Sequence, residues 1–493
     1  MDMPTTTRDA SAKLRHFDDL PGPPTWPFFG NLLQIESTRL HLQLEQWCEQ
    51  YGSIFRLKLG SRRAIVVGDH ELIARALRDR PDGFRRTTRL EAVWNEMGLL
   101  GGVFGATGET WKRQRRMVMA SFDPGHVRRF FPQLHRVAER LVGRWQLAAL
   151  HGTEIDLQAD LMRYTVDAIA GLAFGSDVNT LQSDEDVIQR HLNRIFPALF
   201  KRLFAPLPLW RWLPSAEDRA LQRSVAEVNA AVDGFIAQAR ARLQADPALR
   251  ERPGNLLEAM LVAADEPGSG IDDQQVAGNV LVMLLAGEDT TANSVAWMVH
   301  LLWQNPQALA QATAEVRRVC GDAVAPTLEQ VGQLDYVEAC AHEAMRLKPV
   351  APQNGMQALR DTTLGDVQVS TGMIVLAVMR RDAVSERHVP NAAAFDPARW
   401  LGEGTAQQSA SAAKRISMPF GAGPRICPGR YLALLEMKMA IAVLLNNFEL
   451  QQVGTVDGQA PREKLQLAMA PEGLRMRLRA RAGAPQPVSA LAA

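Results

Sequence analysis

The sequence predicts a mainly α-helical protein with small β-sheets, on three observations. Hydrophobic residues make up 46% of the 493 residues, which is enough apolar material for a large core. Helical periodicity dominates the chain between two short stretches of β pattern. The longest helical stretch begins near Asp272 and Asp273, which suit a helix start, and runs to Gln304, before Asn305-Pro306. Such a helix would be roughly 50 Å long, so it must cross the interior of the molecule.

Two stretches carry the β pattern. Residues 55–69 (FRLKLGSRRAIVVGD) predict two short strands around a Gly-Ser turn, and residues 363–377 predict further strands with turns at their glycines. No linker rich in proline or serine divides the chain, so residues 21–479 are expected to form one domain. Residues 1–20 and the Ala-, Pro- and Gly-rich residues 480–493 are expected to be flexible ends.

Charge and cysteine content exclude several classes of protein. The 55 basic and 54 acidic residues give a net charge of +1, so the sequence predicts no binding to nucleic acid. The cysteines Cys48, Cys320, Cys340 and Cys427 form no Cys-x-x-Cys pair, so we expect a reducing compartment rather than a zinc motif or a disulfide framework. No apolar run has the length of a signal-peptide core or a transmembrane helix. The sequence therefore predicts a soluble, cytoplasmic protein without a membrane anchor.

Cys427 lies in a loop rich in glycine and proline, directly before a helix. The loop reads PFGAGPRICPGR, from Pro419 to Arg430, and the helical pattern YLALLEMKMAIAVLLNNF follows it. The free N–H groups at a helix N-terminus favour a thiolate over a thiol. Glycines let a flat ligand approach the backbone closely, and Arg425 could reach an anionic group on that ligand. For a single cysteine, the alternative is a buried structural residue in an ordinary loop.

The spacing Phe420-x-x-Gly423-x-Arg425-x-Cys427-x-Gly429 resembles the haem-binding loop of the cytochrome P450 family. The resemblance implies the cytochrome P450 fold, with haem b (iron-protoporphyrin IX) buried between the long central helix and the helix after the cysteine loop. Cys427 would be the axial ligand of the iron, where a thiolate favours cleavage of the O–O bond, and Arg425 would contact a haem propionate. The other loop residues expected at the cofactor are Pro419, Phe420, Gly421, Ile426 and Gly429.

The long helix carries the segment AGEDTT (residues 286–291), which resembles the oxygen-activating segment of the same family. The resemblance implies that Ala286 and Gly287 border the haem, with Gly287 leaving room for O₂. Thr290 would hold a water or stabilise the bound oxygen, and Asp289 would relay protons from solvent, because the reaction consumes two protons. The plain alternative is a helix kink with a hydrogen-bonded threonine and an exposed acid.

Two further motifs follow the order of the family. Trp111 and Arg115, spaced by four on one helix, resemble the pair that donates hydrogen bonds to haem propionates. The alternative for this pair is a core tryptophan and a solvated arginine. Glu343 and Arg346 resemble the Glu-x-x-Arg pair of the family, which joins an arginine such as Arg399, in the segment FDPARW, to form a structural triad behind the haem.

One position departs from the family. Cytochrome P450s often carry a propionate-binding arginine at a position that aligns near Met356. Either Arg360 substitutes for this arginine or the contact is absent.

Together the motifs predict an O₂-dependent monooxygenase that hydroxylates or epoxidises a hydrophobic small molecule. No flavin or iron–sulfur domain is recognised, so two electrons would come from a separate ferredoxin- or flavodoxin-type partner fed by NAD(P)H. The basic residues near Trp111 could dock this partner or form an ordinary solvated face, and the protein is expected to be a monomer. The substrate pocket is expected to draw on residues 84–109, Val282, Met283, Ala286, residues 350–352 and residues 468–470.

Three alternatives come from other classes of function. The first is a haem-thiolate isomerase, dehydratase or peroxide-driven enzyme. Such relatives typically lack the acid–alcohol pair, so Asp289 and Thr290 argue against it. The second is a haem-binding sensor or carrier without turnover, and the third is a helical protein without haem in which the motifs occur by chance.

Overall fold

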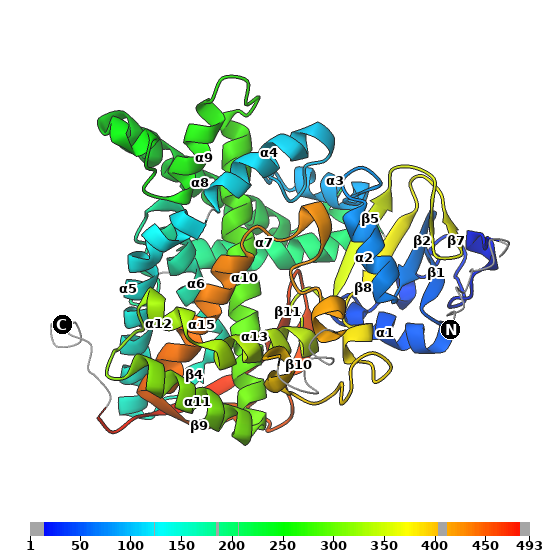
Figure 1. The fold of residues 1–493 in the computed structure, drawn as a ribbon. Coiled ribbons are helices and arrows are strands. Elements are labelled where there is room, and N and C mark those ends of the chain that lie inside the picture. The colour runs from blue at the N-terminus through cyan, green and yellow to red at the C-terminus, as the bar shows by residue number, and fades with distance from the viewer. Residues whose placement is uncertain (1–13, 123, 184–186, 206, 403–411, 484–493) are drawn as a thin grey trace, which may run out of the picture.

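The computed structural model describes residues 14–122, 124–183, 187–205, 207–402 and 412–483, and they form a mainly helical molecule with small sheets (Figure 1). The predicted fold class is therefore confirmed. None of the helices in these residues is long and apolar enough to cross a membrane. The helices are α1 (Leu40–Tyr51), α2 (His70–Arg78), α3 (Thr88–Glu96), α4 (Gly108–Ser121), α5 (Pro124–His151), α6 (Leu157–Phe174), α7 (Val187–Phe204), α8 (Ala216–Ala245), α9 (Leu256–Asp265), α10 (Asp273–Gln304), α11 (Pro306–Cys320), α12 (Leu328–Gly332), α13 (Asp335–Leu347) and α15 (Arg430–Asn447).

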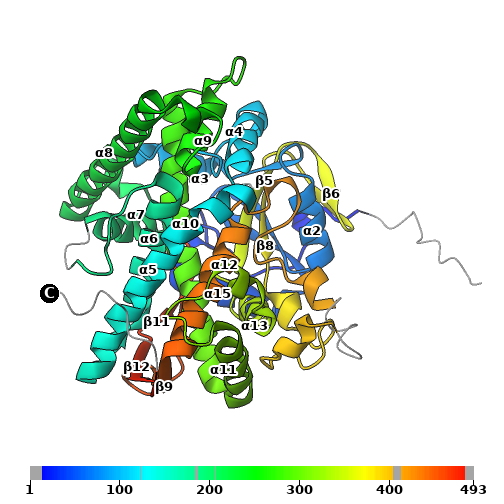
Figure 2. The same cartoon turned by 60° about the vertical axis from the view of Figure 1, so that its left-hand side comes forward.

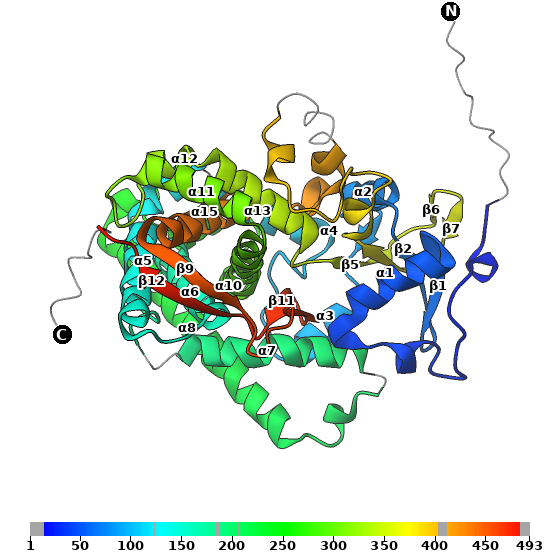
Figure 3. The ribbon, with the colours of Figure 1, turned by 90° about the horizontal axis from the view of Figure 1, so that it is seen from below.

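α10 is the long central helix that the sequence predicts. The carboxylate of Asp272 accepts a hydrogen bond of 2.8 Å from the Gln275 N–H and caps the first turn, and the helix ends at Gln304, as expected. Figure 2 shows α15 running beside α10, and Figure 3 shows α10 in the interior with α6, α13 and α15 around it. Most side chains of α10 are buried in this arrangement. The helix after the cysteine loop therefore packs on the long helix.

The two predicted β stretches meet in one five-stranded sheet, in the order β1-β2-β8-β5-β3. β2 from the first stretch pairs in parallel with β8 from the second, and the other neighbours are antiparallel. A three-stranded sheet has the order β4-β12-β9, and β6-β7 and β10-β11 are separate pairs. The strands are β1 (Ile54–Leu59), β2 (Arg62–Val67), β3 (Phe84–Arg85), β4 (Ile155–Asp156), β5 (Gln353–Ala358), β6 (Thr362–Leu364), β7 (Val367–Val369), β8 (Ile374–Val378), β9 (Phe448–Gly454), β10 (Arg462–Leu465), β11 (Met469–Glu472) and β12 (Arg475–Ala480).

The two chain ends expected to be flexible are partly ordered. Phe17 and Leu20 are buried against the five-stranded sheet, because a short polar segment can still be held by two apolar side chains. At the other end, Ala480 completes β12. Residues 1–13 and 484–493 lie outside the described part of the chain, so the prediction is not tested there.

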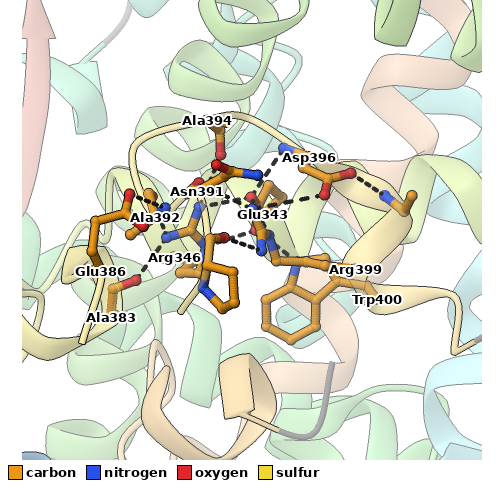
Figure 4. Close-up of polar contacts among 12 residues, drawn as sticks. Glu343, Arg346, Ala383, Glu386, Asn391, Ala392, Ala394, Asp396, Arg399 and Trp400 are labelled. Atoms are coloured by element: carbon orange, nitrogen blue, oxygen red, sulfur yellow. Dashed lines mark hydrogen bonds and ion pairs between the residues drawn. The ribbon is translucent and has the colours of Figure 1, made fainter. Parts of the chain in front are cut away.

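Glu343 is the centre of a buried hydrogen-bond network behind α15 (Figure 4). Its carboxylate accepts two hydrogen bonds from Arg346, at 2.7 and 2.8 Å, and one of 3.0 Å from Arg399. The Trp400 indole N–H and the Asp396 backbone N–H complete its shell, at 2.8 and 3.0 Å. The network thus confirms the predicted triad and adds Trp400. The remaining guanidinium donors bond the carbonyls of Ala383, Pro390, Asn391, Ala392 and Ala394.

We expect Glu343→Gln to lower the free energy of unfolding by about 3–5 kcal/mol, because it removes the buried anion that bonds both Arg346 and Arg399. Urea denaturation followed by circular dichroism measures the change. Glu449→Gln is the matched control, since Glu449 pairs with Arg479 on the surface and its loss should leave the free energy of unfolding nearly unchanged. Equal losses in the two variants would contradict a structural role for the buried triad.

Candidate functional site

The cysteine loop is held in shape by its own backbone and by α2. The Cys427 N–H donates to the Phe420 carbonyl at 2.9 Å, and the Gly429 N–H donates to the Cys427 sulfur. Gly423 has φ +71°, and a Cβ there would lie 2.7 Å from the Cα of Arg78. Only glycine meets both demands. The loop therefore sits directly on α2, with Cys427 three residues before the start of α15.

Burial dominates the electrostatics of Cys427. It raises the pKa of the thiol, while the Gly429 N–H and the charges of Arg115 and Arg430 lower it. The sequence argument that the helix end favours a thiolate is therefore incomplete, because burial outweighs these contributions. A bound metal cation would supply what is missing, since it deprotonates a coordinating thiol. All four cysteines are free, and Cys427 is partly exposed whereas the other three are buried.

The structure brings Trp111 and Arg115 of α4 together with the cysteine loop. Arg115 donates to the Ile426 carbonyl at 2.6 Å. The Arg425 guanidinium lies over the Trp111 ring, 4.7 Å from its centroid, and donates to the Ala106 carbonyl at 2.6 Å. Two motifs that are about 310 residues apart in the chain therefore form one cluster, as the resemblance predicts.

Two arginines that no motif singles out, Arg80 and Arg86, join this cluster. Arg80 is only 3% exposed, and its Nε and Nη1 find no hydrogen-bond partner among the described residues; the same holds for Nε of Arg425. Burial lowers the pKa of Arg80 to about 10, and burial together with repulsion from neighbouring arginines lowers that of Arg425 to about 10 and that of Arg86 to about 9. The guanidinium groups stay charged at neutral pH, so the cluster holds uncompensated positive charge.

Arg360 does not supply the propionate contact that the sequence leaves open. Its guanidinium is exposed and donates to the Asp79 carboxylate at 2.7 Å. Met356, at the aligned position, is fully buried on β5 opposite Val375. The position is apolar because it belongs to the core of the five-stranded sheet.

A short stretch in the middle of α10 is accessible although the helix lies in the interior. Ala286 is exposed and Gly287, Asp289 and Thr290 are partly exposed, whereas the residues on either side are buried. The Thr290 hydroxyl donates to the Ala286 carbonyl at 2.7 Å, which leaves its oxygen lone pairs to accept a hydrogen bond from another group. The predicted segment therefore faces space that a bound molecule can reach.

The Asp289 carboxylate is held by neutral donors. The Asn293 amide donates to its Oδ1 at 2.6 Å, and the Ala468 backbone N–H, in the turn between β10 and β11, donates as well. Burial raises the pKa of Asp289 to about 6, and these two hydrogen bonds oppose the rise. The residue can therefore gain or lose a proton near neutral pH, which suits the predicted relay.

The buried carboxyl of Glu436 links α15 to the segment on α10. Thr291 hydrogen-bonds Glu436, and burial raises the pKa of Glu436 far above its ordinary range. This contact joins the helix of the cysteine loop to the residue next to Thr290. Sequence analysis missed Glu436 because a single acid in an apolar helix has no distinctive spacing, whereas Asn293 could have been found from its i+4 position relative to Asp289.

Gly287 has a packing role that the sequence does not show. A Cβ at this position would lie 2.7 Å from Cδ1 and 2.8 Å from Cγ1 of Ile169 on α6. The missing side chain therefore allows α6 and α10 to pack closely, and the room for O₂ stays a prediction.

Two of the segments expected to form the substrate pocket bond α10, and a third is joined to one of them. The Val103 N–H donates to the side chain of Asn279 at 2.9 Å, and the Ala468 N–H bonds Asp289. The Met469 N–H donates to the Val350 carbonyl at 2.8 Å, which joins the third segment to the same turn.

The donor set fits a haem. Haem is flat and largely apolar, carries two carboxylates, and takes an axial ligand on its iron. Cys427 offers the axial ligand, and the accessible stretch of α10 offers an apolar surface with one hydroxyl. Unpaired positive charge for the carboxylates is also present, because four arginines lack a carboxylate partner among the described residues. They are Arg80, Arg86, Arg115 and Arg425.

Comparison with known proteins agrees with this site. The family model described as cytochrome P450 matches residues 20–478. The chain is 29% identical over 442 residues to a bifunctional cytochrome P450/NADPH–P450 reductase of Fusarium oxysporum, which covers 87% of this chain and 40% of that protein. It is 27% identical over 433 residues to the cyclooctat-9-en-7-ol 5-monooxygenase of Streptomyces melanosporofaciens, with 87% and 89% covered. The cytochrome P450DA heme domain superposes with a TM-score of 0.81 at 26% identity, over 95% of this chain and 99% of that one.

The fold, with the cysteine loop before α15, the arginine cluster beside it and the accessible stretch of α10, fits a haem-binding oxidoreductase. The chain belongs to the cytochrome P450 family and is a monooxygenase, which uses O₂ and electrons from a redox partner.

We expect Gly287→Ala to lower the free energy of unfolding by about 1–3 kcal/mol, because the new methyl group collides with Ile169. Ile169→Ala should relieve this clash, so the double variant should lose less than the sum of the single losses in urea denaturation. Gly143→Ala on α5, where a Cβ meets nothing within 4 Å, is the matched control and should be neutral or stabilising. Additive losses in the double variant would show that the glycine serves another purpose.

Proposed function

We propose that residues 21–479 form one domain that binds haem b between the cysteine loop and the accessible stretch of α10, with the Cys427 sulfur as axial ligand. The observation that carries this proposal is the pairing of a partly exposed cysteine with a cluster of arginines that lack carboxylate partners among the described residues, of which Arg80 is buried and the others are partly buried. A thiol with no anionic cofactor nearby would leave that positive charge unexplained.

The haem propionates would be bound by the arginine cluster. Arg115 and Arg425 already donate to backbone carbonyls and keep further N–H groups for carboxylate oxygens, and Trp111 stacks beneath Arg425. Arg80 and Arg86 supply the positive charge that the family places near Met356. Two arginines from the segment before α3 thus take the place of one from β5. The apolar loop residues named from the sequence would face the porphyrin.

Bound haem supplies the oxygen chemistry, and the thiolate ligand increases the electron density at its iron. The residues of α10 supply positioned protons. With haem bound, Thr290 would be able to accept a hydrogen bond from a water, because its own proton is used on the Ala286 carbonyl. Asp289 would exchange protons with this water near neutral pH. Glu436 fixes Thr291, the neighbour of Thr290, through a hydrogen bond.

The substrate is a hydrophobic small molecule that is hydroxylated or epoxidised. Support comes from the apolar side chains of Val282, Met283 and Ala286 on the side of α10 that the predicted pocket uses, and from Val350 and Met469 on the opposite segments. Apolar linings with a few polar groups are typical of such pockets.

Electrons would reach the haem from a separate ferredoxin- or flavodoxin-type protein fed by NAD(P)H. The basic residues of α4 support a docking surface for an acidic partner, although Lys112 is already engaged by Glu109 at 2.8 Å. The Fusarium oxysporum relative carries a reductase in its own chain, so the source of electrons differs within the family. The free cysteines agree with a reducing, cytoplasmic location of the protein. We also propose that the protein is a monomer.

A turnover assay tests this function. An apolar compound chosen by its shift of the haem spin state should accelerate NAD(P)H consumption with a surrogate redox pair and yield an oxygenated product. Thr290→Ala should keep most of the NAD(P)H consumption but divert electrons to hydrogen peroxide, lowering the product yield about tenfold or more. Thr313→Ala on α11 is the control, because it removes an equivalent hydroxyl-to-carbonyl hydrogen bond far from the site. It should change neither the product yield nor the formation of hydrogen peroxide.

Cys427→Ser removes the thiolate and should abolish product formation and the thiolate-type spectrum of the reduced CO complex. Product formation in this variant at the rate of the unmodified protein would contradict the assignment. Haem binding without substrate-dependent NAD(P)H consumption for any compound of a broad library would favour a sensor or carrier instead.

A further inference from the structure

Three side chains form a hydrogen-bonded line from the acid on α10 to the first turn of α6. Asn293 Nδ2 donates to Asp289 Oδ1 at 2.6 Å and to the Asp289 carbonyl at 2.8 Å. Gln158 Nε2 donates to Asn293 Oδ1 at 2.7 Å. Asn293 is fully buried, whereas Gln158 is partly exposed. The line thus connects the candidate proton relay to a residue that no motif of the sequence marks.

Each bond in this line has only one workable direction. The Asp289 carbonyl can only accept, so the NH₂ end of Asn293 must face Asp289. The oxygen end of Asn293 then faces α6 and needs a donor, which Gln158 provides. Because Asn293 is sealed from solvent, water cannot replace that donor, and a buried amide oxygen without a partner costs about 1–3 kcal/mol. Gln158 and the Asp289 carbonyl therefore act together to fix which end of the amide the Asp289 carboxylate meets.

We propose that Gln158 is a positioning residue for the proton relay: by donating to Asn293, it keeps the amide of Asn293 turned so that it donates to the ionised carboxylate of Asp289. The inference rests on the proposed function for the meaning of the relay, but its geometry does not depend on the haem. An amide turned the other way would present its oxygen to the carboxylate and stabilise the protonated acid instead.

Among the described residues, no charged side chain contributes to the shift in the pKa of Asp289. The contributions are burial, the Asn293 amide and the Ala468 N–H. Acids and bases on the packed elements have contacts of their own. Among them are Glu288 on α10, Glu436 with Thr291, Asp160 with Arg144 and Arg163, Asp167 with Thr180, Lys438 with Glu338, and Glu463 with Arg380 and Lys348.

Two substitutions of Gln158 separate the proposal from a merely structural role. In Gln158→Glu, the new carboxylate can only accept, so Asn293 should turn its NH₂ end towards α6, and the added negative charge acts in the same direction. We expect the pH of half-protonation of Asp289 to rise from about 6 by about one unit or more. Gln158→Leu only removes the donor and should give a smaller rise.

The readout is the infrared absorption of the protonated Asp289 carboxyl in the ferric holoprotein, identified by its loss in Asp289→Asn and followed against pH. The midpoint of the pH dependence of kcat should rise more in Gln158→Glu than in Gln158→Leu, and KM should change little in both variants. Gln133→Glu and Gln133→Leu are matched controls on α5, where Gln133 bonds Arg136 at the surface, and should leave the midpoint in place.

An unchanged midpoint in both Gln158 variants, with the holoprotein folded, would overturn the proposal. The infrared titration needs no turnover. A holoprotein that shows the shift but makes no product would therefore contradict the proposed function and leave this inference supported.

Discussion

Buried positive charge beside the Cys427 loop is the constraint on which the rest of the site depends. Arg80 and Arg425 are desolvated, lie close enough to repel, and have N–H groups without partners among the described residues. An uncompensated buried cation costs several kcal/mol. A dianionic cofactor offsets this cost, and a haem bound through its propionates is the one that also uses the cysteine. The cluster therefore lowers the free energy of unfolding of the apoprotein, before the cofactor binds.

The scaffold keeps this unfavourable arrangement in place through close backbone contacts. Gly423 lets the cysteine loop rest on α2, and Gly287 lets α10 approach α6. Glu343 ties two buried arginines to the segment that leads into the loop. Each of these contacts involves either a glycine or a fully hydrogen-bonded ion pair. Repulsion within the arginine cluster therefore does not easily displace the packed elements.

The parts of the site that are local in sequence could be predicted, and the parts that the fold assembles could not. The loop around Cys427, the segment with Asp289 and Thr290, and the bounds of α10 follow from spacing within a few residues. Arg80 and Gln158 have no such spacing, because their role comes from packing between distant elements. The packing role of Gly287 could not be predicted either, since the sequence does not show that Ile169 faces it.

The most direct test is to measure both the stability of the Arg80→Leu apoprotein and its affinity for haem. These two quantities should change in opposite directions. The apoprotein should gain about 1–3 kcal/mol because a buried unpaired charge is removed, while haem affinity should fall about tenfold, or about 1.4 kcal/mol. Arg360→Leu, which removes an exposed guanidinium, should change neither quantity appreciably. A loss of apoprotein stability in Arg80→Leu together with unchanged haem affinity would contradict the claim that the arginine cluster exists to bind an anionic cofactor.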